Sequence, residues 1–232
     1  MPTEPAYLVH ERFYSWQGEG VYAGRAAFFI RLFGCPVKCP WCDSAGTWHP
    51  NYVPKHINRM TPRELADEVE ASKAPIVIVT GGEPTIHDLR PLLKELKRIP
   101  NLRVHLETMG GFPIQGVFDW ITLSPKWARL PLPENVRRAD EFKIIVESHT
   151  GLWEWFSYLA FPVEGKAKQI WLHPEWSKRN DPKVLNTITE AVKMHPTVLR
   201  AGYQLHKLFK ADSADNRSAP TAPLGGNPAL GV

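Results

Sequence analysis

The sequence lacks several features that are typical of membrane, secreted and nucleic-acid-binding proteins. Its longest apolar stretches, residues 26–30 and 75–79, are far shorter than the roughly 20 residues of a membrane-spanning helix. No secretory signal is indicated after Met1, because Glu4 is charged and no apolar run follows it. No long block of Lys and Arg is present either, and the net charge is only +4. We therefore expect a cytoplasmic protein that binds neither membranes nor nucleic acid.

Cysteine is scarce, and its placement is the most informative feature of the chain. The 232 residues include only three cysteines, Cys35, Cys39 and Cys42. Three is an odd number in a chain expected to be cytoplasmic, so a disulfide scaffold is excluded. Unrelated cysteines would fall this close together only about three times in a thousand. The grouping therefore predicts a metal site rather than three ordinary reduced thiols.

The composition divides the chain into a folded part and a tail. Hydrophobic residues make up 43% and charged residues 22% of the chain, which is enough apolar material for a real core. Residues 211–232 differ, because they contain five Ala, three Gly and three Pro and no aromatic residue. Such a segment buries too little apolar surface to offset the entropy of ordering it. We expect residues 1–210 to form one domain and residues 211–232 to be a disordered tail or a remnant of cloning.

Strand and helix signals alternate along the folded part. Strands are predicted at residues 26–33, 75–80, 102–106, 120–123, 142–146, 169–172 and 198–203. Helices are predicted after a capping box at 61–64, from residue 88 to before Pro100, near 151–159, and over 181–194 with Val184, Leu185, Ile188 and Val192 inward. Six or more buried strands separated by helices indicate an α/β fold with a mostly parallel sheet, either open or curled into a partial barrel.

Polar and special residues follow the predicted strands at one edge of this sheet. In parallel sheets, ligands bind beyond the carboxyl ends of the strands. The residues in these positions are Cys35, Gly81, Gly82, Glu83, Glu107, Thr108, Ser124, Pro125, Lys126, Glu147, His173 and Pro174. The sequence therefore predicts the functional site at this edge.

Two kinds of metal centre fit the cysteine spacing. A structural zinc ion takes four tetrahedral ligands, so the three thiolates with His49 or His10 would make a non-catalytic Cys3His zinc module. An iron–sulfur cube has four irons, each usually held by a thiolate, so three cysteines would leave one iron open to a small ligand. The spacing of the cysteines leaves both alternatives open.

The cysteine segment resembles a known signature. Cys35, Cys39 and Cys42, with Trp41 before the third, match the C-x3-C-x-aromatic-C pattern of the radical S-adenosylmethionine (radical SAM) superfamily. Further segments match one family in order: FYSWQGEG (13–20), FFIRLFGCPVKCPWCDS (28–44), VTGGEPTIHDL (79–89), LETMG (106–110), LSPK (123–126), EFKIIV (141–146), LHP (172–174) and QLHK (204–207). Together the match covers about residues 8–210. On these residues the chain resembles the 7-carboxy-7-deazaguanine synthase family.

The resemblance implies a fold, cofactors and an activity. The fold would be the partial or modified (β/α)6 barrel of the radical SAM type. Cys35, Cys39 and Cys42 would hold a [4Fe-4S] cluster whose open iron binds S-adenosyl-L-methionine (SAM), which is cleaved to a 5′-deoxyadenosyl radical. The enzyme would be a lyase that converts 6-carboxy-5,6,7,8-tetrahydropterin to 7-carboxy-7-deazaguanine with loss of ammonia, in queuosine and 7-deazapurine biosynthesis. A glycyl-radical-enzyme activase of the same superfamily is the alternative, because its size and cysteine spacing are similar.

The same resemblance implies roles for individual residues. SAM would contact Trp41, Asp43, Gly82, Glu83, Ser124, Pro125 and Lys126. The pterin would contact Trp16, Gln17, Gly18, Glu19, Arg31, Thr80, Glu107 and His206, with the Arg31 guanidinium clamping its carboxylate. Mg²⁺ would bind Ser44, which stands where the family usually has Thr and keeps the hydroxyl. His173 stands where family members commonly have Gln.

Partners are implied in the same way. They are the small-molecule pterin, a one-electron donor such as flavodoxin, and a second copy of the chain in a homodimer. Family members can also place their C-terminal carboxylate near the substrate. This chain continues for more than twenty residues beyond the QLHK segment, so the same contact is not expected here.

Overall fold

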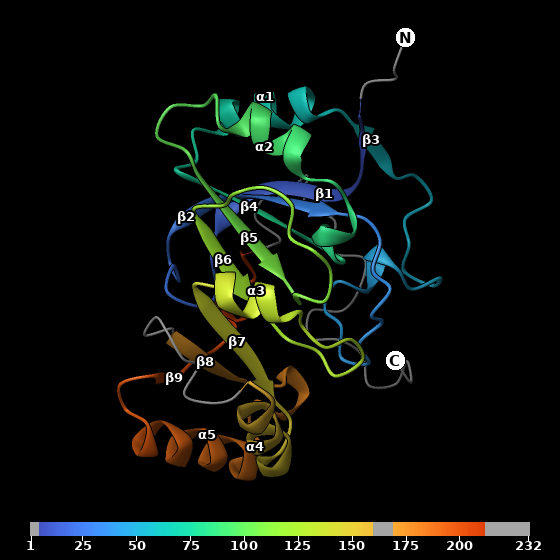
Figure 1. The fold of residues 1–232 in the computed structure, drawn as a ribbon. Helices are drawn as coiled ribbons and strands as arrows, with labels where there is room; N and C mark the ends of the chain where they lie inside the picture. Colours follow the sequence, from blue (N-terminus) through green and yellow to red (C-terminus); the bar gives the residue numbers. More distant parts are fainter. Residues whose placement is uncertain (1–4, 160–168, 212–232) are drawn as a thin grey trace.

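A single, mostly parallel sheet organises the protein, whose computed structural model describes residues 5–159 and 169–211. Its nine strands lie in the order β3-β1-β2-β4-β5-β6-β7-β8-β9. Strand β1 runs antiparallel to both of its neighbours, and all other adjacent pairs are parallel. The edge strands β3 and β9 do not pair with each other, so the barrel is open (Figure 1). The predicted α/β class with a mostly parallel sheet is confirmed.

The elements follow one another in the alternation that the sequence indicates. The strands are β1 (Tyr7–Trp16), β2 (Ala26–Leu32), β3 (Asn58–Met60), β4 (Ile76–Gly81), β5 (Arg103–Thr108), β6 (Trp120–Leu123), β7 (Glu141–Val146), β8 (Gln169–Pro174) and β9 (Leu199–Ala201). The α-helices are α1 (Pro62–Ser72), α2 (Arg90–Leu96), α3 (Pro133–Arg138), α4 (His149–Tyr158), α5 (Pro182–Met194) and α6 (Leu205–Phe209). Three short 3₁₀ helices are η1 (Ala45–Thr47), η2 (Pro84–Ile86) and η3 (Trp176–Lys178).

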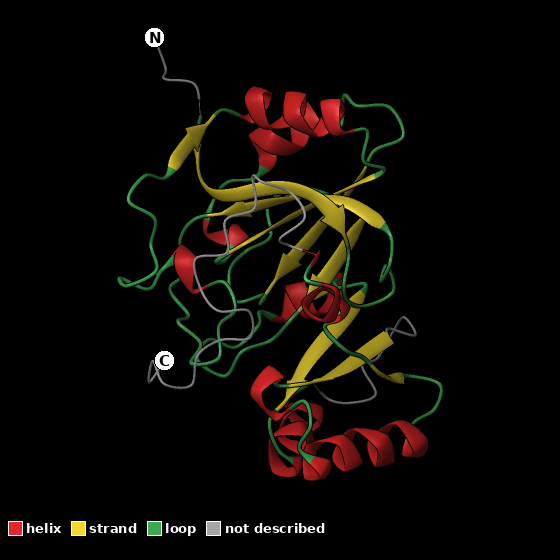
Figure 2. Ribbon diagram, turned by 180° about the vertical axis from the view of Figure 1, so that it is seen from behind, coloured by secondary structure: helices red, strands yellow, loops and turns green. Residues whose placement is uncertain are grey.

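Helices cover one face of the sheet, which we call the outer face. At one end α1 and α2 pack against each other, with α1 also contacting β2 (Figure 2). At the other end α4 packs on β7, and α5 packs on β8 and β9 (Figure 1). In the part of the chain that the structure describes, no helix has both the length and the apolar composition needed to cross a membrane.

Strand alternation separates an apolar outer face from a polar inner face. On β5, Leu106 is fully buried in the core beneath the helices, whereas the next residue, Glu107, lines a pocket on the inner face. On β7, Ile144 belongs to the same core and Lys143 lines the same pocket. Because successive side chains of a strand point to opposite faces, the core and the pocket are built from the same strands.

All seven strands predicted from the sequence are present, with ends that differ by at most two residues. The helix predicted to start at Asp88 starts two residues later, at Arg90, whose amide donates to the Asp88 carboxylate at 3.1 Å. The inward placement of Leu185 was wrong. Helix α5 buries Val184 and Ile188, and Leu185, about 100° further round the helix, is 37% exposed.

The sequence did not predict β1, and the reason is a break in its alternation. Tyr7 and Val9 belong to the outer core, but Phe13 lines the pocket on the inner face. Pairing with β2 changes register between Val9 and Glu11, which is the mark of a β-bulge. A bulge inserts one residue and reverses which side chains face the core. The period of two is lost there, so no regular pattern marks the strand.

Local signals at helix ends were more reliable. The predicted capping box is confirmed: Thr61 Oγ1 accepts the Glu64 amide at 3.2 Å, and Glu64 Oε2 accepts the Thr61 amide at 2.7 Å. The predicted tail lies outside the described residues except for Ala211, which is buried and whose carbonyl accepts the Ser15 hydroxyl at 3.4 Å.

Candidate active site

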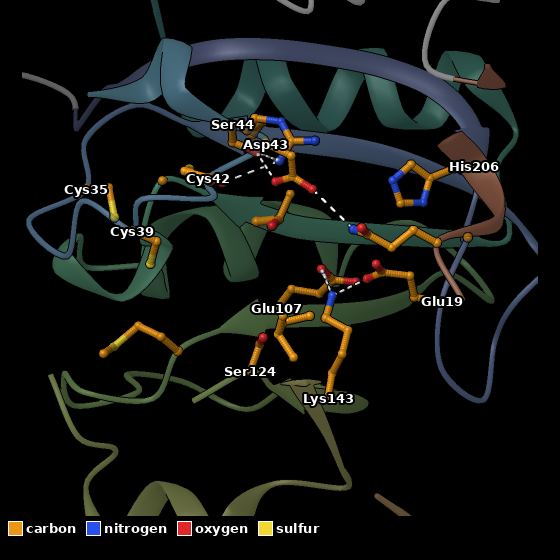
Figure 3. A pocket seen from close by; sticks show the side chains of 18 of the residues that line it. Glu19, Cys35, Cys39, Cys42, Asp43, Ser44, Glu107, Ser124, Lys143 and His206 are labelled. Atoms are coloured by element: carbon orange, nitrogen blue, oxygen red, sulfur yellow. Dashed lines mark hydrogen bonds and ion pairs between the residues drawn. The ribbon is translucent and has the colours of Figure 1, made fainter. Parts of the chain in front are cut away.

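One pocket on the inner face collects almost all the side chains that the sequence predicts to be functional. Of the predicted contacts, only Pro125 does not line it. Those that do are Trp16, Gln17, Gly18, Glu19, Arg31, Cys35, Cys39, Trp41, Cys42, Asp43, Ser44, Thr80, Gly82, Glu83, Glu107, Ser124, Lys126 and His206. The cysteines lie at one end of the pocket, Glu19, Lys143 and His206 at the other, and Asp43 and Ser44 between them (Figure 3).

The three cysteines lie on the loop that leaves β2. All are free thiols with side chains that are partly buried. Burial raises the pKa of each, that of Cys42 to about 12, so a positively charged metal centre is needed to keep them as thiolates. The indole N–H of Trp48 donates to Cys42 Sγ at 3.4 Å, the kind of contact that tunes iron–sulfur centres. These features fit an iron–sulfur cluster.

The alternative of a single zinc ion finds less support. His49 does not line the pocket, and its Nδ1 accepts the Asn51 amide at 3.2 Å. Among the described residues no three His, Cys, Asp or Glu side chains converge as ligands of one ion. With Zn–S bonds of about 2.3 Å, tetrahedral zinc would need sulfurs only about 3.8 Å apart. A cubane instead spreads its thiolates over separate corners, so it does not require the three sulfurs to converge on one ion.

The glycines after β4 bring the strand end and the cysteine loop together. A side chain on Gly82 would place its Cβ 2.0 Å from the Gly34 carbonyl oxygen. That same oxygen accepts the Glu83 amide at 2.8 Å. The contact that requires a glycine at position 82 is thus with the chain's own loop, and it fixes Cys35 beside β4.

Glu83 is almost completely buried and joins the ends of β4 and β5. Its Oε1 accepts the Thr85 amide at 3.0 Å and the Thr108 hydroxyl at 2.6 Å, and it also accepts the Thr85 hydroxyl. Its Oε2 accepts the Met109 amide at 2.9 Å. The Oε1 atom is thus fully used within the protein, and only Oε2 keeps a lone pair for an ammonium group.

The predicted ribose-side residues form a compact unit after β6. The Lys126 ammonium donates to the Ser124 hydroxyl at 2.7 Å and to its carbonyl at 2.8 Å. It also lies 5.1 Å from the centre of the Trp41 ring, in a cation–π contact. Burial lowers the pKa of Lys126, although the nearby cysteines oppose this. Lys126 therefore connects β6 to the cysteine loop.

A second set of charges surrounds Ser44 in the middle of the pocket. Arg31 reaches it from β2, donating to Ser44 Oγ at 2.9 Å and to Glu11 Oε1 at 2.5 Å. Asp43 Oδ2 lies 3.2 Å from the Lys207 ammonium. Burial would raise the pKa of Asp43, but Lys207 and Arg31 together hold it well below its usual range. The serine is therefore flanked by one fixed cation and one fixed anion.

Carboxylates and amide groups form the far end of the pocket. Gln17 Nε2 donates to Glu107 Oε1 at 2.6 Å, and Gln17 Oε1 accepts the Glu19 amide at 3.1 Å. The Lys143 ammonium binds Glu19 Oε2 and lies 3.4 Å from Glu107 Oε2. Burial would raise the pKa of Glu19, but Lys143 outweighs it and the pKa falls below its usual range.

Two histidines flank this end. His206, on α6, stands against the backbone at Gly18, where an added Cβ would lie 2.2 Å from its Nδ1. His173, on β8, is fully buried and does not line the pocket, and its Nδ1 lies 4.0 Å from Glu19 Oε1. Burial lowers the pKa of His173 to about 4, so the ring is neutral near pH 7. His173 thus lies behind Glu19 rather than in the pocket.

Sequence reasoning missed four charged residues of the pocket: Glu11, Lys143, Glu175 and Lys207. Lys143 could have been found, because Glu141 and Lys143 alternate with Phe142 and Ile144 on a predicted strand. Charges at every second position of a buried strand indicate a polar inner face. Lys207 lies outside any predicted strand or helix, so no alternation of charged and apolar residues marks it as a pocket residue.

Comparisons with known proteins agree with this geometry. A family model described as the radical SAM superfamily matches residues 29–126. The 7-carboxy-7-deazaguanine synthase of Synechocystis sp. is 40% identical over 202 residues, covering 87% of this chain and 92% of that protein. The synthase of Escherichia coli K12 is 32% identical over 198 residues, covering 72% and 84%. The crystal structure of QueE from Escherichia coli matches with a TM-score of 0.74 and 29% identity, over 87% of this chain and 95% of that one.

Proposed function

Because the chain belongs to the 7-carboxy-7-deazaguanine synthase family of the radical SAM superfamily, we propose that it converts 6-carboxy-5,6,7,8-tetrahydropterin to 7-carboxy-7-deazaguanine and ammonia. It is a radical SAM lyase whose cofactors are a [4Fe-4S] cluster and SAM. When bound, these supply the one-electron chemistry that begins the ring contraction. The observation that carries the proposal is that one pocket joins a three-cysteine loop to a carboxylate pair, Glu19 and Glu107.

The cluster and SAM would occupy the cysteine end of the pocket. We assign the cluster to Cys35, Cys39 and Cys42, whose loop is fixed by β4 and by Trp48. The side chains around this loop would hold SAM; they are Trp41, Asp43, Gly82, Glu83, Ser124 and Lys126, with Pro125 shaping the turn. Their part in the reaction is to orient SAM and to exclude water.

The substrate would lie between the middle and the far end of the pocket. Its carboxylate would bind near the Arg31 guanidinium, and its guanidine-like ring edge would donate to Glu107 and Glu19. Arg31, Glu19 and Glu107 come from different elements and line the same pocket, where Figure 3 shows Glu19 and Glu107 on either side of Lys143. The walls between the two ends are formed by Trp16, Gln17, Gly18, Thr80 and His206.

Mg²⁺ is proposed to bind at Ser44 together with the substrate carboxylate. Ser44 Oγ accepts from Arg31 and lies 3.3 Å from Asp43 Oδ1, so a cation there meets a nearby anion but competes with a guanidinium. Mg²⁺ usually takes few protein oxygens and keeps several waters, which this arrangement allows. The ion would be recruited with the substrate rather than held by the empty pocket.

Further parts of the proposal rest on the family alone. Radical SAM chemistry needs an electron from outside the enzyme, and we propose a flavodoxin-type donor in the cytoplasm. We also propose a homodimer and a product that serves queuosine or another 7-deazapurine route. The activase alternative gains no support, because a protein substrate would leave the carboxylates Glu19 and Glu107 without an assigned role.

An anaerobic assay tests the proposal. Protein reconstituted with iron, sulfide and SAM is given the pterin and a reductant, and 7-carboxy-7-deazaguanine is measured by mass spectrometry, with Mg²⁺ or with a chelator. We expect product from the wild type, more of it with Mg²⁺, and none from Cys39→Ala. Lys38→Gln, an exposed position in the same loop that does not line the pocket, is the matched control and should retain activity. SAM cleavage without product from the pterin would refute the substrate; full activity of Cys39→Ala would refute the cluster assignment.

A further inference from the structure

Lys143 occupies an unusual place for a lysine. It projects from the middle of β7 onto the inner face, and its side chain is only 11% exposed. Its ammonium binds Glu19 from the loop after β1 and lies 3.4 Å from Glu107 on β5. A lysine is rarely buried unless it is paired, and this one is shared by two carboxylates. The Lys143 ammonium therefore connects β7 with β5 and with the loop after β1, which are distant from one another in the sequence.

The two carboxylates need this cation. A buried carboxylate without a nearby cation favours its protonated form. Glu19 is the more enclosed of the two, with its Oε1 buried and without a hydrogen-bond partner among the described residues. A protonated carboxyl presents one O–H donor, whereas an ionised one accepts at both oxygens and so suits the adjacent N–H groups of a guanidine-like edge. Lys143 thus maintains the charge state that this edge requires.

Lys143 is poorly suited to a role as a proton donor. Burial would lower its pKa, but the charges of Glu107 and Glu19 outweigh burial and hold the pKa above its usual range. Its ammonium therefore keeps its proton at any pH near neutral. A permanent cation can position and neutralise neighbouring groups, but it does not supply a proton to a leaving amine.

We propose that Lys143 is a positioning residue that keeps Glu19 ionised and holds Glu19 and Glu107 in place as the acceptor pair for the guanidine-like edge of the substrate. This inference rests on the proposed function, because that function supplies the substrate edge. Lys143 is separate from the cluster and SAM residues. Its effect is on substrate recognition, through two carboxylates.

Other titratable groups lie around Lys143, Glu19 and Glu107 and affect any titration there. They are His173 on β8, His206 and Lys207 on α6, Asp43 in the cysteine loop, Lys126 after β6 and Glu141 on β7. The readout must therefore be the difference between variant and wild type, in which the contribution of these groups is common to both.

The test compares Lys143→Met, Lys143→Arg and the exposed control Lys183→Met. Binding of 6-carboxypterin to the SAM-loaded, reconstituted enzyme is measured by calorimetry from pH 5.5 to 8.5, and KM and kcat for the tetrahydropterin are measured alongside. In Lys143→Met the buried Glu19 should keep a proton, so affinity should fall at least tenfold near pH 6 and recover as the pH rises. KM should rise more than kcat falls. Lys143→Arg should restore most of the affinity, and Lys183→Met should match the wild type.

Two results would overturn the inference. One is wild-type affinity with a wild-type pH profile in a folded Lys143→Met; the other is a fall in kcat with KM unchanged, which would place Lys143 in the reaction itself. Thermal unfolding and iron content confirm that each variant is folded and loaded, and Lys143→Gln, which also removes the charge, stands in if the methionine variant does not fold. If the wild type binds 6-carboxypterin with the predicted dependence on Lys143 but gives no product, the proposed reaction fails while the role of Lys143 stands. If the wild type does not bind the probe, the inference fails.

Discussion

The two faces of the sheet are made by the same strands yet have opposite characters. On β5 the outer residue Leu106 is fully buried among apolar side chains, and the inner residue Glu107 holds Gln17 and Lys143. On β4 the outer residue Val79 lies in the core, and the inner residue Thr80 lines the pocket. The outer face stabilises the fold by burying apolar surface. The inner face instead carries partly buried charged side chains, which serve recognition and chemistry. Neighbouring positions in the chain can therefore be changed to affect stability or chemistry separately.

Of substitutions at the neighbouring residues Leu106 and Glu107, Leu106→Ala should have the larger effect, and that effect should be on stability. The side chain is fully buried beneath the helices, so the substitution removes apolar contacts and leaves a cavity. We expect the free energy of unfolding to fall by about 2–5 kcal/mol. Denaturant unfolding measures this, and activity per folded molecule should change little. A fall in activity that is larger than the loss of folded protein would show that the two faces are not separable.

Glu107→Gln should change recognition with little effect on stability. Gln keeps the shape of the side chain but removes a charge that meets both Lys143 and, as we propose, the substrate edge. A lost hydrogen bond to a charged group costs about 1.5–3 kcal/mol, so kcat/KM should fall about 10- to 100-fold. Steady-state kinetics give this value, and unfolding by denaturant gives the stability. If stability falls as far as in Leu106→Ala, then Glu107 is mainly a structural residue.

Thr61→Ala should have the smallest effect, at a helix end that belongs to neither face. The substitution removes the hydroxyl that accepts the Glu64 amide at the start of α1. We expect the protein to be destabilised by about 1 kcal/mol with unchanged kinetics. The matched control is Thr187→Ala, whose hydroxyl bonds the Lys183 carbonyl within α5 and is not a cap. Equal destabilisation by both substitutions would mean that the cap is not what stabilises α1.

Features that depend on a few neighbouring residues were predictable. The capping box at Thr61, the buried strand β4 and the grouping of Cys35, Cys39 and Cys42 can each be read from a short window. Strand alternation together with the rule for parallel sheets was enough to bring most site residues to one edge. These signals work because hydrogen bonding and alternation act over a few residues.

Features that depend on partners distant in the chain were not predictable. The bulge in β1 is visible only against β2, and Lys207 reaches the pocket only because α6 folds back onto the loop at Gly18. The sequence does not show that the Glu83 carboxylate accepts hydrogen bonds from the Thr108 hydroxyl and the Met109 amide, at the end of the neighbouring strand. Leu185 looked inward, and only the packing of α5 on the sheet shows that it is not.

The sequence by itself determined which chemical groups the protein has and the order in which strands present them. The spacing of the cysteines and the residues at the strand ends depend only on short stretches of the chain. The metal-binding loop and the functional edge of the sheet could therefore be predicted without knowledge of the tertiary contacts. Tertiary structure alone decided which charges meet. The charge states of Glu19 and Asp43 depend on Lys143 and Lys207, because the distances in these ion pairs are set across the fold and not along the chain.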